Sequence, residues 1–122
     1  MDEIRCFVSE NKNKIHLFAV TESWLADDIH DCMLSIPNYS IIRNDRKHRK
    51  GGGVCIWCNN SISFELFTPI DLQPIEIEVI CIVLKVFEFV VCLVYIPPSL
   101  NALAYDKISQ YLISAYDEVL NV

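Results

Sequence analysis

Residues 19–25 read Ala-Val-Thr-Glu-Ser-Trp-Leu, and the rest of the chain is organised around this stretch. An apolar run that starts at Ile15 ends at Val20, and a lone acid, Glu22, follows it directly. Strand ends often carry functional sites, because the sheet fixes the backbone while the side chain reaches solvent. Glu22 is therefore a candidate site residue. The alternative interpretation is an ordinary solvated loop acid.

Length and composition indicate one folded domain spanning residues 1–122. The chain is 52% hydrophobic, which is enough for a single core, and it has only five prolines and three glycines. These values exclude a disordered or low-complexity chain.

The charge is unevenly distributed, although the net value is −6. Half of the ten Lys and Arg residues lie between positions 43 and 50, namely Arg43, Arg46, Lys47, Arg49 and Lys50. Guanidinium and ammonium groups bind phosphate oxygens, so several cations in a row can follow a nucleic-acid backbone. The alternative interpretation of this basic loop is a solvated hairpin tip.

The six cysteines do not indicate disulfides or a metal site. No secretory signal segment opens the chain, and four of the six cysteines lie in apolar runs, where a free thiol behaves as a small buried hydrophobe. Cys55 and Cys58 have CxxC spacing but lie within an expected strand. Residues three apart in a strand point to opposite faces, so these thiols should not share a metal.

The apolar run from Val79 to Ile96 resembles a membrane span only in length. It contains Lys85 and Glu88 near its middle and is rich in β-branched residues. These features favour two buried strands joined by a tight turn, and we expect no membrane association.

Hydrophobic periodicity predicts an α/β protein. We expect helices over residues 2–11 and from an N-cap at Asn101 toward the C-terminus, the second with Ile108, Leu112, Ala115 and Val119 on one face. Strands are expected over 15–20, 39–43, 54–58, 62–67, 75–86 and 89–95, with a helical turn within 29–34. Glu76 and Glu78 indicate that the strand starting at residue 75 is half exposed at its beginning.

Three segments, taken together, resemble a known family. These are Thr21-Glu-Ser-Trp-Leu25, then Tyr39-Ser-Ile-Ile-Arg-Asn-Asp-Arg46 followed by basic residues and Gly51-Gly-Gly-Val54, and finally Val94-Tyr-Ile-Pro-Pro98. In this order they resemble the endonuclease/exonuclease/phosphatase-type domain of non-LTR retrotransposons. The resemblance implies a two-sheet α/β sandwich of mostly antiparallel strands flanked by helices.

The resemblance also implies a site and a cofactor. Glu22 corresponds to the acid that binds the catalytic Mg²⁺ (or Mn²⁺), and Tyr95 to the tyrosine that approaches the scissile phosphate. The implied activity is hydrolysis of a DNA phosphodiester, with DNA contacted by the basic loop. Since both residues sit at the C-terminal ends of apolar strands, we expect Glu22 and Tyr95 to lie near each other at one rim of the sheet.

Several segments of the family pattern have no counterpart in this sequence. The family begins with a strand that carries a metal-binding Asn, and it has later Gly-Asp-x-Asn and Ser-Asp-His segments. The expectation is therefore the N-terminal half of such an endonuclease, inactive alone. Its partners would be the other half of the domain and a reverse transcriptase, and its location intracellular and nuclear. The alternatives are a non-catalytic nucleic-acid-binding remnant and a phosphatase of the same superfamily.

Overall fold

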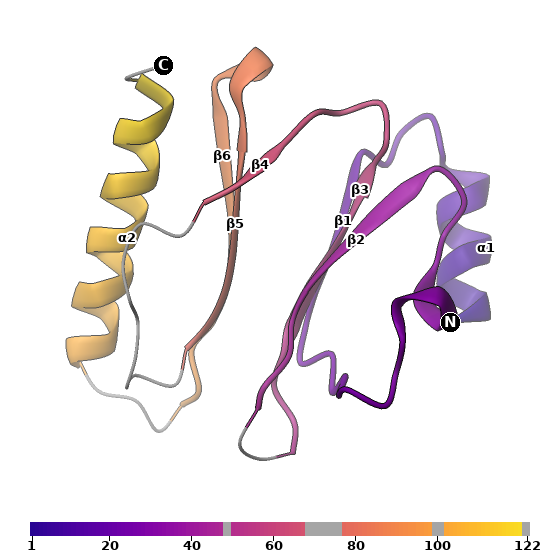
Figure 1. Cartoon of the computed structure of the whole chain (residues 1–122), viewed down its shortest axis with the longest axis horizontal. Coiled ribbons are helices and arrows are strands. Elements are labelled where there is room, and N and C mark those ends of the chain that lie inside the picture. Colours follow the sequence, from indigo (N-terminus) through magenta and orange to yellow (C-terminus); the bar gives the residue numbers. More distant parts are fainter. Residues whose placement is uncertain (48–49, 68–76, 99–101, 121–122) are drawn as a thin grey trace.

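The computed structural model describes residues 1–47, 50–67, 77–98 and 102–120, apart from the side chains of 118 and 120. Two small antiparallel sheets and two α-helices make up an α/β fold, as expected. The layers follow one another in the order α1, first sheet, second sheet, α2 (Figure 1).

The first sheet has the strand order β1-β3-β2, where β1 is Leu17–Thr21, β2 is Tyr39–Asn44 and β3 is Val54–Asn59. Both outer strands run antiparallel to β3. The five residues from Val54 to Cys58 are all buried, as an uninterrupted apolar run in a central strand requires. The strands predicted over 39–43 and 54–58 are confirmed, and β1 begins two residues later than predicted.

The second sheet has the order β4-β5-β6, where β4 is Glu65–Leu66, β5 is Glu78–Leu84 and β6 is Phe89–Tyr95. A short 3₁₀ turn, η2 (Lys85–Phe87), and Glu88 with φ of +57° join β5 to β6. This confirms that the apolar run from Val79 to Ile96 forms two paired strands.

Helix α1 (Asp2–Glu10) and helix α2 (Ala102–Leu120) cover the outer faces of the two sheets (Figure 1). Asp2 and Glu3 lie in the first turn of α1, where acids interact favourably with the helix dipole. A second 3₁₀ turn, η1 (Asp31–Leu34), matches the helical turn predicted within 29–34.

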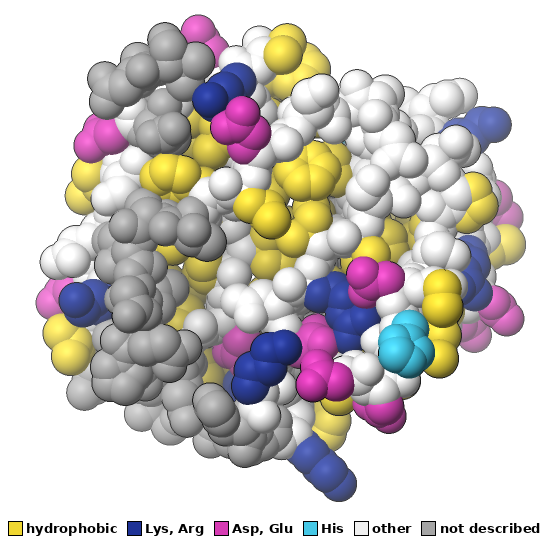
Figure 2. Space-filling model, in the orientation of Figure 1, with side chains coloured by type: hydrophobic (Ala, Val, Ile, Leu, Met, Phe, Trp, Pro, Cys, Tyr) yellow, Lys and Arg dark blue, Asp and Glu magenta, His cyan; other side chains and the backbone are white. Residues whose placement is uncertain are grey.

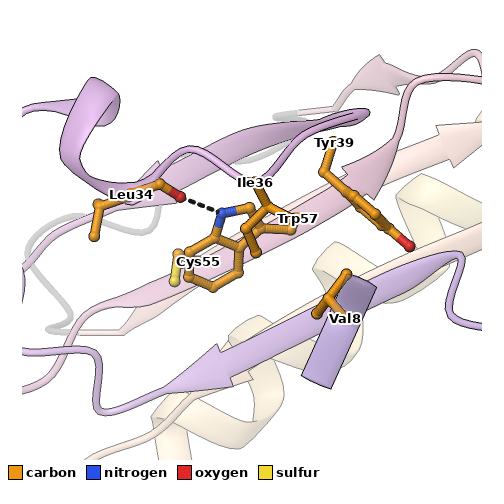
Figure 3. Packing of buried hydrophobic residues seen from close by; sticks show 6 residues of the cluster. All are labelled: Val8, Leu34, Ile36, Tyr39, Cys55 and Trp57. Carbon is orange, nitrogen blue, oxygen red and sulfur yellow. Dashed lines mark hydrogen bonds between the residues drawn. The ribbon is translucent and has the colours of Figure 1, made fainter. Parts of the chain in front are cut away.

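A first core lies between α1 and the first sheet, and Figure 3 shows its side chains. Trp57 packs there and donates its indole N–H to the carbonyl of Leu34 at 2.9 Å. Cys55 points to the same side as Trp57, and burial raises the pKa of its thiol to about 11. The whole cluster comprises Val8, Leu34, Ile36, Tyr39, Cys55 and Trp57.

A second core joins the facing sides of the two sheets. Val54 and Ile56 of β3 pack there against Ile80, Ile82 and Leu84 of β5. Alternation along β3 therefore places Cys58 on this side and Cys55 on the α1 side. The prediction that the CxxC thiols point to opposite faces is confirmed.

A third core lies between the second sheet and α2. Cys81 of β5 packs against Tyr111 and Ala115 of the helix. Cys81 and Cys92 are direct partners in the β5–β6 register, and their sulfur atoms lie 2.7 Å apart as free thiols. The hydrogen bond to Cys92, together with burial, raises the pKa of Cys81.

Three details differ from the sequence-based expectations. The strand predicted over 62–67 is reduced to β4, whereas Ile62 and Phe64 pack into the core between the sheets without joining a strand. Leu112 is exposed, and Tyr111 takes its place on the buried face of α2. The start of β5 is not half exposed, since Glu78 is only 6% exposed. Glu76 and the proposed N-cap Asn101 lie outside the described residues.

Candidate functional site

Five strand ends converge at one end of the two facing sheets. From the first sheet come the residues after β1, those after β2 and those before β3. From the second sheet come the first residue of β5 and the last residue of β6. Acidic and basic side chains lie side by side in the lower half of the space-filling view, where these strand ends lie in Figure 1 (Figure 2). We call Glu22, Arg46, Glu78 and Tyr95 the strand-end site.

Glu22 lies on the exposed side of the strand-end site. It has a left-handed backbone with φ of +55°, an uncommon conformation for a residue with a side chain. Its carboxylate accepts a hydrogen bond of 2.8 Å from the indole N–H of Trp24. A hydrogen bond with Tyr95, then that of Trp24, and the charge of Arg46 lower the pKa of Glu22 below its ordinary value. The carboxylate is therefore held ionised and in a fixed orientation.

Tyr95 completes the contact between the two sheets. It shares a hydrogen bond with Glu22 that raises the pKa of the phenol, while Arg46 acts in the opposite direction. The guanidinium of Arg46 lies 5.7 Å from the centre of the Tyr95 ring, within cation–π range. The prediction that Glu22 and Tyr95 lie near each other at one rim is confirmed, and their catalytic roles stay predictions.

Arg46 and Glu78 form an ion pair between the sheets. Arg46 Nε donates to Glu78 Oε1 at 2.7 Å, and the two side chains are only 15% and 8% exposed. The same carboxylate oxygen accepts the backbone N–H of Gly53 at 3.2 Å. Hydrogen bonding to Glu78 raises the pKa of Arg46, so the guanidinium is a permanent positive charge at the site.

The triple glycine leaves the space that Arg46 occupies. Gly51, Gly52 and Gly53 all have positive φ, which glycine adopts at little cost. A Cβ on Gly52 would lie 2.3 Å from the guanidinium carbon of Arg46, and one on Gly53 would lie 2.7 Å from Ser23 Oγ. Both the positive φ values and the close packing therefore favour glycine at these positions.

Three buried polar atoms of this region have no hydrogen-bond partner within the described part of the chain. They are Ser23 Oγ, Arg46 Nη2 and Glu78 Oε2. Buried polar groups are rarely left unpaired in proteins. The strand-end site therefore retains hydrogen-bonding capacity.

The cationic side chains of the basic loop differ in whether they are exposed to solvent or engaged inside the protein. Arg43 bonds to Asp45 at 2.6 Å, to Asp31 at 2.9 Å and to the carbonyl of Ile29, so its guanidinium is engaged inside the protein. Lys47 and Lys50 are exposed, and Lys47 lies 3.8 Å from Asp27. Arg49 falls outside the described residues. Of the described cations of the basic loop, only the two lysines thus extend into solvent.

The described residues do not by themselves fit a catalytic metal. Glu22 offers one carboxylate, and Glu78 is engaged by Arg46. Within the described ranges no group of three His, Cys, Asp or Glu side chains lies close enough to hold an ion. Mg²⁺ takes octahedral coordination by oxygen ligands, which one carboxylate does not fix.

Glu78 is the site residue that sequence reasoning missed. Its position shares the period of Ile80, Ile82 and Leu84, the face of β5 that packs against the first sheet. An acidic residue on an apolar face indicates that a basic residue is buried beside it. The basic loop contains the arginine and lysine side chains that could pair with it. That alternation was the signal that could have identified Glu78.

No protein-family model, curated protein or solved structure matched the chain. Neither α1 nor α2 combines the length and apolar character that crossing a membrane requires.

Proposed function

We propose that the strand-end site binds a phosphodiester group of DNA as one part of a metal-dependent endonuclease centre. The observation that carries the proposal is the contact between Glu22 and Tyr95 beside the guanidinium of Arg46. The resemblance of the three sequence segments to retrotransposon endonucleases supports it, and so does the way in which the segments converge. In that family the fold is a two-sheet sandwich, and we extend this assignment to the two facing sheets.

The side chains of the site suit different parts of that task. Tyr95 can turn its hydroxyl proton from Glu22 to a phosphate oxygen, and Arg46 supplies a fixed positive charge. Lys47 and Lys50 can contact phosphates on either side of that position. Glu22 repels a phosphate, so the two share a site only when a cation lies between them.

A complete metal centre requires ligands beyond Glu22. We therefore propose that the other half of the endonuclease domain supplies them, and that this chain alone binds DNA without cutting it. A magnesium ion held by Glu22 and those further ligands would supply charge neutralisation at the phosphate and an activated water. Action on chromosomal DNA would place the protein in the nucleus.

Gel shift and nicking assays on the same supercoiled plasmid test the proposal. We expect weak binding and no Mg²⁺-dependent nicking by the 122-residue chain. The exposed Lys47 and Lys50 should contribute about −2 to the log–log salt slope, which the double alanine variant should lose. Lys12→Ala/Lys14→Ala, an exposed pair beside α1, is the matched control.

Three outcomes would overturn the proposal. Binding that is unchanged in Lys47→Ala/Lys50→Ala and in Arg46→Ala would place DNA elsewhere. Metal-dependent nicking that disappears in Glu22→Ala would show that this chain already holds a complete centre. Hydrolysis of a small phosphomonoester without any DNA binding would favour the phosphatase alternative.

A further inference from the structure

A surface groove of about 510 Å³ adjoins the strand-end site. Its walls combine one large aromatic ring with three cationic side chains. The lining residues are Trp24, Leu25, Ala26, Arg46, Lys47, Lys50 and Gly51. An aromatic face beside several cations is the combination that proteins use to bind single-stranded nucleic acid.

Trp24 is exposed although its position is fixed. The side chain is 64% exposed, whereas the other tryptophan, Trp57, is 3% exposed. The indole N–H donates to Glu22 at 2.8 Å, and the backbone N–H of Trp24 donates to the carbonyl of Gly52 at 2.9 Å. Because hydrogen bonds already hold both the edge of the ring and the backbone of the residue, the side chain loses little conformational entropy when a ligand covers it.

The backbone at Trp24 is also unusual. Its φ is +57°, a conformation that is a genuine outlier for a bulky residue and that often marks functional positions. Gly51 lies against the ring, since a Cβ there would be 3.3 Å from Trp24 Cζ2. The chain thus holds an apolar ring in solvent with a strained backbone, and burial of a core does not explain this.

We propose that Trp24 stacks on an unpaired base of a DNA strand whose flanking phosphates are bound by Lys47 and Lys50. This inference rests on the proposed function and adds the feature of DNA that the site recognises. Trp24 can stack only on a base that is not already stacked between its neighbours in a duplex. Single-stranded or distorted DNA should therefore bind better than an intact duplex. Because every base has an aromatic face, the contact itself selects little sequence.

Tryptophan fluorescence tests the inference with a control inside the chain. Short single-stranded oligonucleotides should quench the emission of Trp24, while buried Trp57 should be unaffected. In Trp24→Phe the quenching should disappear, whereas affinity measured by anisotropy of a labelled strand should be largely kept, because a phenyl ring still stacks. Trp24→Ala should lose about tenfold or more in affinity.

An oligonucleotide with abasic sites separates this inference from the proposed function. It keeps the phosphates and removes the stacking partners, so we expect it to bind about tenfold or more weakly than the intact strand. Equal binding of the two strands would overturn stacking and leave phosphate binding intact. Absence of binding by both would overturn the proposed function as well. This comparison uses the unmodified chain, so it holds even where Trp24→Ala fails to fold.

Discussion

Glu78 of β5 and Tyr95 of β6 lie directly opposite each other in the antiparallel register, and both contact Arg46, which follows β2 of the other sheet. A cross-strand pair at the end of a hairpin thus presents an acceptor and an aromatic face to one guanidinium. The pair fixes how the second sheet meets the first at the strand-end site. Its integrity should therefore affect both stability and ligand binding.

Removal of Arg46 should destabilise the protein strongly. Arg46→Ala leaves Glu78 buried without its countercharge, which should lower the free energy of unfolding by about 3 kcal/mol. Urea denaturation measures this loss. Because burial of the pair itself is costly, the double variant Arg46→Met/Glu78→Leu should recover much of the stability. Lys47→Ala breaks only an exposed contact to Asp27 and should change stability by less than ~1 kcal/mol.

Substitution of Gly52 should displace the same guanidinium. Gly52→Ala places a Cβ 2.3 Å from Arg46 Cζ, so the ion pair with Glu78 must shift. The matched control is Gly51→Ala, which also has positive φ but whose Cβ would lie 3.3 Å from the Trp24 ring and 3.8 Å from Arg46 Nη1, an ordinary contact distance. Thermal unfolding should show a clearly larger loss for Gly52→Ala. Equal losses would mean that backbone strain alone, and not the contact with Arg46, explains the glycine.

Acid should release Trp24 from Glu22. The pKa of Glu22 is lowered from 4.5, so its interactions stabilise the fold above the unfolded-state pKa and are lost as the pH falls through the lower folded-state value. A fluorescence titration should show a Trp24 transition below pH 4.5 that is absent in Trp24→Phe. Tyr95→Phe removes the largest cause of the lowered pKa, so the midpoint should rise. An unchanged midpoint would contradict the contact between Glu22 and Tyr95.

Mild oxidation should link Cys81 to Cys92. The residues are register partners, and Cα atoms of such pairs lie about 4.5–5.5 Å apart, within the range that a disulfide spans. A diazene oxidant such as diamide accepts the two hydrogens as the S–S bond forms. Burial, which disfavours the thiolate at both positions, should make the reaction slower than that of an exposed thiol. Non-reducing peptide mapping identifies the bond. Failure of Cys81 and Cys92 to join while the exposed Cys6 and Cys32 react with the oxidant would contradict this prediction.

Several elements could be predicted because they rest on local patterns. Residues 54–58 and 89–95 are apolar runs bounded by turn residues, and they form strands with nearly the predicted limits. The approach of Glu22 to Tyr95 also followed from their places at strand ends. These inferences needed only the hydrophobic periodicity of each segment and the positions at which the apolar segments end.

Other features depend on partners that are distant in the sequence. Arg46 and Glu78 are 32 residues apart, and no local pattern states that they pair. The engagement of Arg43 by Asp31, Asp45 and a loop carbonyl likewise removes from solvent a cation that composition alone assigned to DNA. The exposure of Leu112 depends on how α2 is rotated against β5 and β6. Tertiary packing decided each of these outcomes.

The wide sequence separation of the residues at the strand-end site has a kinetic consequence. The β5–β6 hairpin closes through a short turn, whereas Arg46 reaches Glu78, and Glu22 reaches Tyr95, only after the two sheets have met. Long-range contacts form slowly because loop-closure entropy is lost before they form. In stopped-flow refolding, the circular-dichroism signal of strand formation should therefore appear before the fluorescence of Trp24 reaches its native value. The site would be assembled in the last step of folding, together with the docking of the sheets.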